Sequence, residues 1–131
     1  MENRGAMAAS RQLKTRFTNV VLRNDSIYGL DDGILCCVDV ETGKTRLQRN
    51  GRYSHGQILL VEDLLLVQAE NGDLAAGPCR SACVQELARV PALTGKTWNN
   101  PTLCGNRLLV RNAEQAICFE LALRDPSRQA Q

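Results

Sequence analysis

The strongest constraint on the fold is an internal repeat of short apolar runs separated by turn residues. Residues 20–40, "VVLRNDSIYGLDDGILCCVDV", align with residues 58–78, "ILLVEDLLLVQAENGDLAAGP", when Gly33 is placed above Gly72. A third copy, "TLCGNRLLVRNAEQAICFEL" at residues 102–121, aligns through Asn106 and Asp63. Each copy reads strand, tight turn, strand, polar turn, strand. A repeat of about 40 residues built this way is typical of a β-propeller blade.

The apolar runs define the expected strands, because they alternate with Asn-Asp, Asp-Asp-Gly, Asn-Gly and Gly-Asn turn signals. Asp31 and Asp32 resemble a carboxylate pair, but with Gly33 they more simply predict a hairpin turn. Strands are predicted at residues 18–22, 26–30, 34–40, 57–61, 64–69, 101–104, 107–112 and 116–121, with fourth, outer strands at residues 44–48 and 85–90.

The predicted fold class is all-β, a partial β-propeller of about three antiparallel blades. The blades are expected at residues 14–50, 56–93 and 97–122, between a flexible segment at residues 1–13 and a frayed tail at residues 123–131. The third copy lacks an outer strand, and residues 11–17, "RQLKTRF", read as the outer strand of a blade whose other strands are absent. A closed ring needs about four to eight blades, so we expect the C-terminal fragment of a longer protein, or copies that associate through exposed blade edges.

Composition and charge exclude several classes of protein. The chain has 131 residues, of which 44% are apolar, and sixteen Lys and Arg against fourteen Asp and Glu leave a net charge of +2, too small and too evenly spread for a nucleic-acid footprint. Glu62 and Asp63 interrupt the longest apolar run, so no membrane span is predicted. No apolar core follows the basic residues at the N-terminus. The chain as written is expected in the cytoplasm, or exported if a longer parent carries a signal peptide.

Residues 15–46, "TRFTNVVLRNDSIYGLDDGILCCVDVETGKTR", resemble the repeat of the PQQ-binding-like β-propeller family, in which "GxLxxxDxxTGxxxW" closes each blade. The matching positions are Gly33, Leu35, Asp39, Thr42 and Gly43, while Leu47 stands where the family has Trp. The resemblance covers residues 14–122 and looks like the last blades of bacterial propellers of this kind. Dehydrogenases of the family use a full ring, a stacking Trp, a calcium ion and a catalytic Asp. These parts cannot be assembled here, so we expect no catalytic residues, cofactor or metal.

One stretch departs from the repeat. Residues 75–85, "AAGPCRSACVQ", stand where a third apolar strand and a turn belong. Pro78 has no N–H to donate to a sheet, so Gly77-Pro78 is expected to break the strand. Either the blade is irregular here, or the coding sequence is shifted in frame over a short stretch, which would also explain two of the cysteines.

Six cysteines, at positions 36, 37, 79, 83, 104 and 118, are expected to be buried thiols, because no secretory signal favours disulfides. Adjacent cysteines form a disulfide ring in some quinoprotein dehydrogenases, but Cys36 and Cys37 should point to opposite faces of a strand. Cys79 and Cys83 have the spacing of a ligand pair. A structural zinc needs four ligands, and His55 is the only histidine.

The candidate binding surface is the pair of loops between blades, at residues 52–55 and 96–100. We expect a non-catalytic propeller scaffold or protein-interaction module. The alternatives are a remnant of a PQQ-dependent dehydrogenase and a relative of the propeller lipoprotein that helps assemble outer-membrane proteins. The residues predicted to form the interaction surface are Arg52, Tyr53, His55, Lys96, Trp98 and Asn99.

Overall fold

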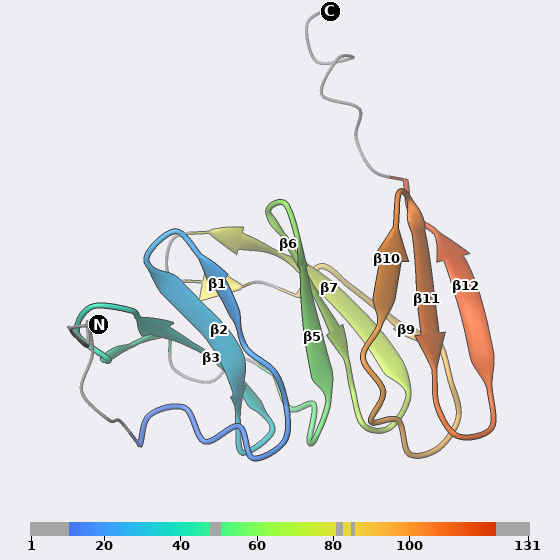
Figure 1. Ribbon diagram of the computed structural model, residues 1–131, viewed down its shortest axis with the longest axis horizontal. Coiled ribbons are helices and arrows are strands. Elements are labelled where there is room, and N and C mark those ends of the chain that lie inside the picture. The colour runs from blue at the N-terminus through green and yellow to red at the C-terminus, as the bar shows by residue number, and fades with distance from the viewer. Residues whose placement is uncertain (1–10, 48–50, 81–82, 85, 123–131) are drawn as a thin grey trace, which may run out of the picture.

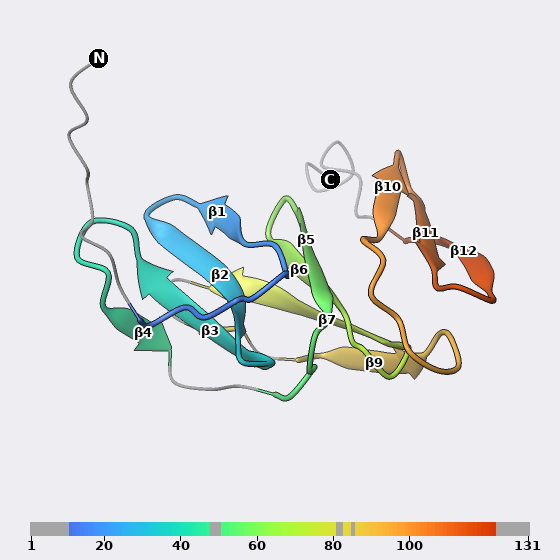
Figure 2. The ribbon, with the colours of Figure 1, turned by 60° about the horizontal axis from the view of Figure 1, so that its bottom comes forward.

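The computed structural model describes residues 11–47, 51–80, 83–84 and 86–122. The described chain is all-β, as predicted, and its strands form three antiparallel sheets that stand side by side as blades (Figure 1). The first strands of the three sheets lie along one side of the arc, and the outer strands of the first two sheets lie on the other side (Figure 2). This arrangement is a partial β-propeller.

Blade 1 is a four-stranded antiparallel sheet with the strands in chain order. A tight turn joins its second and third strands, with positive φ angles at Asp32 (47°) and Gly33 (85°). The prediction that Asp31, Asp32 and Gly33 make a hairpin turn is therefore confirmed. The strands are β1 (Val21–Arg23), β2 (Ser26–Asp31), β3 (Ile34–Asp39) and β4 (Thr45–Leu47).

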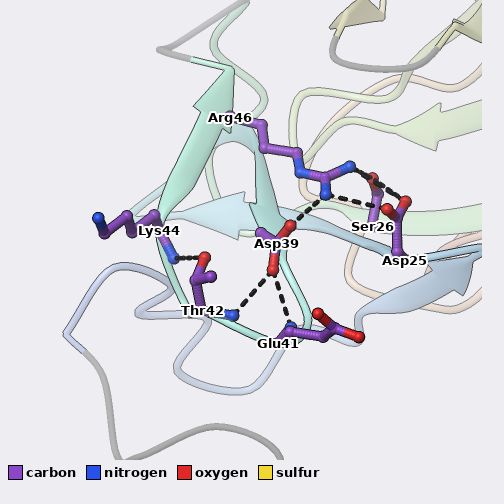
Figure 3. Close-up of polar contacts among 7 residues, drawn as sticks. All are labelled: Asp25, Ser26, Asp39, Glu41, Thr42, Lys44 and Arg46. Atoms are coloured by element: carbon purple, nitrogen blue, oxygen red, sulfur yellow. Dashed lines mark hydrogen bonds and ion pairs between the residues drawn. The ribbon is translucent and has the colours of Figure 1, made fainter.

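A network of polar contacts closes the outer side of blade 1 (Figure 3). The Asp39 carboxylate accepts the backbone N–H of Glu41 at 2.9 Å and of Thr42 at 2.8 Å. The Arg46 guanidinium donates to Asp39 and, at 3.0 Å, to both carboxylate oxygens of Asp25. The Thr42 N–H and then Arg46 lower the pKa of Asp39 to about 2. Asp39 and Arg46 thus hold β4 against the turn that precedes β2.

Blade 2 departs from the prediction at Gly77-Pro78, which do not break the third strand. β7 runs through both residues, and Pro78 pairs with Leu64 of β6. The Cys79 N–H donates to the carbonyl of Asp63 at 2.7 Å, so the nitrogen of Pro78 faces away from β6. On that far side, Ala76 pairs with β9 and Cys79 with β8, and Pro78 lies between the two pairings. The strands are β5 (Gln57–Val61), β6 (Leu64–Gln68), β7 (Asp73–Arg80), β8 (Cys83–Val84) and β9 (Ala88–Pro91).

Blade 3 contains β10 (Thr102–Cys104), β11 (Arg107–Arg111) and β12 (Ala116–Glu120). Among the described residues no fourth strand pairs with β12, which agrees with the prediction for the third copy. The hairpin register is regular, with Leu109 opposite Cys118 and Val110 opposite Ile117.

The N-terminal segment is not the outer strand of a preceding blade, and the strand predicted at residues 18–22 is found only at Val21–Arg23. Residues 11–20 instead cross a face of blade 1 (Figure 2). The Lys14 N–H donates to Asp31 Oδ1 at 2.9 Å, and the Leu13 side chain lies against Gly29, where an added Cβ would meet it at 2.9 Å. Gly29 alternates along β2 with the side chains that face blade 2, so residues 11–20 cover the opposite face.

Apolar side chains fill the two spaces between neighbouring blades. Between blades 1 and 2 the buried cluster includes Tyr28, Leu35, Ile58 and Leu65. Between blades 2 and 3 it includes Leu66, Leu74, Leu93, Leu108 and Val110. Because side chains alternate across a strand, the successive residues Leu65 and Leu66 of β6 enter different clusters. Blade 2 is therefore packed on both faces.

Candidate functional site

Three connections meet at one end of the blades, the lower end in Figure 1: the link from blade 1 to β5, the β6–β7 turn, and the link from β9 to β10. The two loops that were predicted to bind a partner are the first and the third of these. Hydrogen bonds to Glu70 join them. We call residues 52–55, Glu70 and residues 94–98, together with Phe17, the Glu70 loop cluster.

Glu70 holds the two loops together with four hydrogen bonds. Its backbone N–H donates to the carbonyl of Tyr53 at 3.0 Å, and its own carbonyl accepts the N–H of Thr97 at 2.8 Å. Its carboxylate accepts the backbone N–H of His55 at 3.1 Å and the indole N–H of Trp98 at 2.9 Å. These donors, His55 foremost, lower the pKa of Glu70. The carboxylate is therefore a structural anion that fixes both loops.

Exposed aromatic side chains form the outer surface of this cluster. The Phe17 ring centroid lies 4.8 Å from that of His55 and 6.1 Å from that of Trp98. Phe17 is 61% exposed and Trp98 is 48% exposed. The Lys96 ammonium lies 4.8 Å from the Trp98 ring centroid, within the range of a cation–π contact. Two large rings and a cation are thus presented together at the surface.

The other predicted residues take different places. Tyr53 is only 4% exposed, because its ring belongs to the core between blades 1 and 2 and its hydroxyl donates to Glu86 Oε2 at 2.6 Å. Burial and then Glu86 raise the pKa of Tyr53. Its ring is not available to a partner, whereas Arg52 is exposed and Asn99 is half-buried.

Beside the aromatic surface lies a shallow hollow of about 300 Å³, lined by Ser54, Glu70, Asn71, Gly95 and Lys96. This volume is at the lower end of the range for small-molecule pockets. A smaller hollow of about 90 Å³ is lined by Arg52, Tyr53, Ser54, Ala69, Asn71 and Arg89. The larger hollow is the more open of the two, and the lining of the smaller one is mainly polar.

Two of these residues, Glu70 and Phe17, were not predicted as part of the site. Glu70 stands in the turn sequence "AENGD", where an acidic residue signals only a polar turn. Phe17 reaches the cluster because residues 11–20 cross blade 1 instead of forming a strand, which the sequence pattern did not indicate. Glu70 and Phe17 join the cluster because of how the blades and the N-terminal segment are placed in space, which the spacing of residues along the sequence does not reveal.

The five cysteines whose side chains the structure describes divide into two groups. Cys36, Cys37 and Cys79 are buried free thiols, and burial raises the pKa of Cys36 to about 11. Cys37 and Cys79 lie in the core between blades 1 and 2, while Cys36 pairs with Gly29 on the opposite face. The expectation of burial is wrong for Cys104 and Cys118, which are exposed in blade 3.

The thiol pair Cys79 and Cys83 was the candidate for metal ligands. Cys83 lies in β8, but its side chain is outside the described residues. Within the described ranges no group of three or more His, Cys, Asp or Glu is placed to hold a metal ion. No helix in this part of the chain is long and apolar enough to cross a membrane.

No protein-family model and no curated protein sequence matches the chain. Among solved structures, the chain is similar to BamB from Moraxella catarrhalis, a propeller lipoprotein, with a TM-score of 0.59 and 17% identity over 76% of this chain and 30% of BamB. It is also similar to the computationally designed protein Ika8, with a TM-score of 0.61 and 10% identity over 78% of this chain and 32% of Ika8.

The computationally designed protein Ika4 matches with a TM-score of 0.51 and 8% identity, over 89% of this chain and 98% of Ika4. The chain therefore spans about a third of the length of Ika8 and of BamB, and nearly the whole of Ika4. At such low identities the likeness concerns the fold alone. Together with the three blades, it establishes an all-β fold of the β-propeller type.

Proposed function

We propose that this chain is a non-catalytic propeller module that binds a protein partner through the Glu70 loop cluster. The observation that carries the proposal is the exposed pair Phe17 and Trp98 beside Lys96, with the indole N–H of Trp98 fixed by the Glu70 carboxylate. Large aromatic side chains dominate the binding energy of protein interfaces. Propellers expose their connecting loops at the ends of the blades, which is where this surface lies.

The rigidity of the cluster supports the same function. Because Glu70 fixes both loops through four hydrogen bonds, a partner would meet an ordered surface and would lose less affinity to the ordering of loops. The adjoining hollow beside Gly95 and Lys96, of about 300 Å³, has room for a projecting side chain of a partner.

We further propose that the chain represents the last blades of a longer bacterial protein of the PQQ-like repeat type. The turn that Asp39 and Thr42 form in blade 1 is the part of the chain that carries this resemblance. The Glu70 loop cluster favours a relative of the propeller lipoprotein over a dehydrogenase remnant, because the lipoprotein alternative predicts a partner bound through loops. The dehydrogenase alternative predicts alcohol-dependent dye reduction after reconstitution with PQQ and calcium, and we expect none.

Site-specific photo-crosslinking in extracts of the source cells tests the binding surface. A photoreactive residue at position 96 should give a discrete adduct, while the same residue at the exposed position Leu87 should not. Excess unlabelled wild-type protein should suppress the adduct, and excess Trp98→Ser protein should not. Equal suppression by the two competitors, or equal adduct yields at positions 87 and 96, would refute the proposed surface.

A further inference from the structure

The last described strand, β12, is exposed although its sequence is as apolar as that of a buried strand. The four central residues of β3, the third strand of blade 1, are all buried. In β12, by contrast, four of the five residues are exposed and Phe119 is half-buried. Ile117 is 38% exposed although it points towards blade 2, opposite Val110. The strand therefore has the composition of a covered element and lacks its cover among the described residues.

The backbone of β12 offers an ordered row of hydrogen-bonding groups at its outer edge. The Leu121 N–H donates to the carbonyl of Asn106 at 2.6 Å, and the Asn112 N–H donates to the carbonyl of Gln115 at 2.9 Å. Leu121 and Gln115 flank β12, and the direction of the backbone hydrogen-bonding groups alternates from one residue to the next. The odd-numbered residues of β12, Ile117 and Phe119, therefore bond to β11. The backbone N–H and C=O of Ala116, Cys118 and Glu120 therefore point outward.

Other outer strands of this chain carry features that discourage pairing, and β12 does not. β4 has three residues, with Arg46 at its centre, and β9 contains Arg89 and ends at Pro91. Short length, charge and proline are common protections of edge strands. β12 has five residues, and Glu120 at its end is the only charged one.

We propose that, when the chain stands alone without further blades, a second copy of it pairs with β12, antiparallel and about a two-fold axis at Cys118, so that the sheet of blade 3 continues across two molecules. In this register Cys118 faces Cys118 of the second copy, and Ala116 faces Glu120 of the second copy. Each of these outward pairs exchanges two backbone hydrogen bonds. Ile117 and Phe119 then form aliphatic–aromatic pairs across the axis, which stabilise antiparallel strands.

The charges of blade 3 fit this register. Arg111 lies opposite Ala116 in the β11–β12 hairpin, and Ala116 in turn faces Glu120 of the second copy. Two strand spacings of about 4.8 Å separate Arg111 from that Glu120, a distance that the Arg and Glu side chains together span across the small Ala116. The two-fold axis generates a second, equivalent pair of Arg111 and Glu120, so one ion pair lies on each side of the contact. Shifting the register by one step moves Glu120 away from its place opposite Ala116 and leaves fewer outward groups paired.

A head-to-tail arrangement, in which blade 3 of one copy stacks on blade 1 of the next, is disfavoured by the covered face of blade 1. Residues 11–20 lie on that face and are held there by the Lys14 N–H bond to Asp31 and by ion pairs from Lys14 and Arg16 to Asp32. A stacking copy would have to displace these contacts. The edge of β12 needs no displacement of described residues.

Sedimentation of the full chain from low micromolar to submillimolar concentration tests the contact. The wild-type chain should form dimers, and Cys118→Lys should sediment as a monomer, because it places two like charges across the axis. Cys104→Lys is the matched control, since Cys104 is also exposed in blade 3 but lies on β10, and it should dimerise as the wild type does. Circular dichroism and Trp98 emission verify that each variant is folded.

A charge reversal gives a second, independent readout of the register. Glu120→Arg should weaken the dimer about fivefold for each exposed ion pair, and adding Arg111→Glu should restore it. A wild-type chain that remains monomeric throughout the range would overturn the proposal. A dimer that survives Cys118→Lys, or that the double variant fails to restore, would do the same. Phe17→Ser, which alters only the partner surface, should leave dimerisation unchanged.

Discussion

Two glycines in the connections around the Glu70 loop cluster allow a matched test of the packing between blades. Gly72 and Gly95 both have positive φ angles, 98° and 85°, which side-chain-bearing residues rarely adopt. A Cβ added at Gly95 would meet nothing within 4 Å, whereas one added at Gly72 would lie 2.0 Å from the carbonyl oxygen of Leu93. Substitution by alanine therefore has the same conformational cost at both positions, but it creates a steric clash only at Gly72.

The magnitudes separate the two variants clearly. Gly95→Ala should cost about 1–2 kcal/mol, the usual penalty for an L-residue in the left-handed region. Gly72→Ala carries the same penalty and must also move the Leu93 backbone. That movement breaks the bond from the Leu93 N–H to the Gly72 carbonyl, 2.9 Å long, which is worth about 1 kcal/mol. It also loosens the buried Leu93 side chain, whose full burial is worth about 1.5–3 kcal/mol.

Gly72→Ala should therefore be less stable than Gly95→Ala by about 2–4 kcal/mol. Urea unfolding measures the difference, followed by circular dichroism and by the emission of Trp98, the only tryptophan. With a slope of about 2 kcal/mol per molar, the Gly72→Ala midpoint should be about 1–2 M lower. Equal midpoints, or a lower one for Gly95→Ala, would refute the role assigned to the contact between Gly72 and Leu93.

Three further predictions use other parts of the chain. Leu108→Ala, in the buried cluster between blades 2 and 3, should lower the free energy of unfolding by about 2–5 kcal/mol, whereas Leu109→Ala on the exposed face should cost under about 1 kcal/mol in the same urea assay. The pKa of Asp39 is about 2 in the folded chain against an ordinary value of 3.8, so its stabilisation is complete above pH 3.8 and is lost as the pH falls towards 2. Between pH 4 and pH 2 the urea midpoint of the wild type should therefore fall more than that of Asp39→Asn, and parallel curves would contradict the assignment. Cys118 should react with a thiol reagent in the native protein, while Cys36, buried and with its pKa raised to about 11, should react only on unfolding, as mass mapping of the labelled thiols can determine.

The repeat predicted the blades well because it reflects a physical requirement that each blade meets separately. Every inner strand needs apolar residues on both faces, and every hairpin needs residues that accept unusual backbone angles, as Asp32 and Gly33 do. Pro78 was misjudged because a missing N–H matters only where another strand needs it. The Pro78 nitrogen points to the outer side of β7, at the place between the residues that pair with β9 and those that pair with β8, so no strand needs its N–H.

The candidate site was predicted only in part, because it is assembled by tertiary contacts. The sequence placed His55 and Trp98 in loops between blades, but it gave no sign that Glu70 would hydrogen-bond to both. Phe17 joins them because residues 11–20 lack a strand partner and cross blade 1. Tyr53 was assigned to the surface with its neighbours, yet its ring fills the core between blades 1 and 2. Position along a loop does not determine which side chains turn inward.

The segment that crosses blade 1 also bears on how far association can proceed. A molecule with two complementary open faces adds copies end to end, and a contact that does not close on itself grows into a fibre. Here Leu13 and Lys14 occupy one face, so within the described part of the chain only the far end of the arc is open for a copy to join. A two-fold contact uses that end on both molecules at once. Residues 11–20 would thereby act as a terminator that keeps the assembly finite, and their removal should convert a dimer into polymers of increasing length.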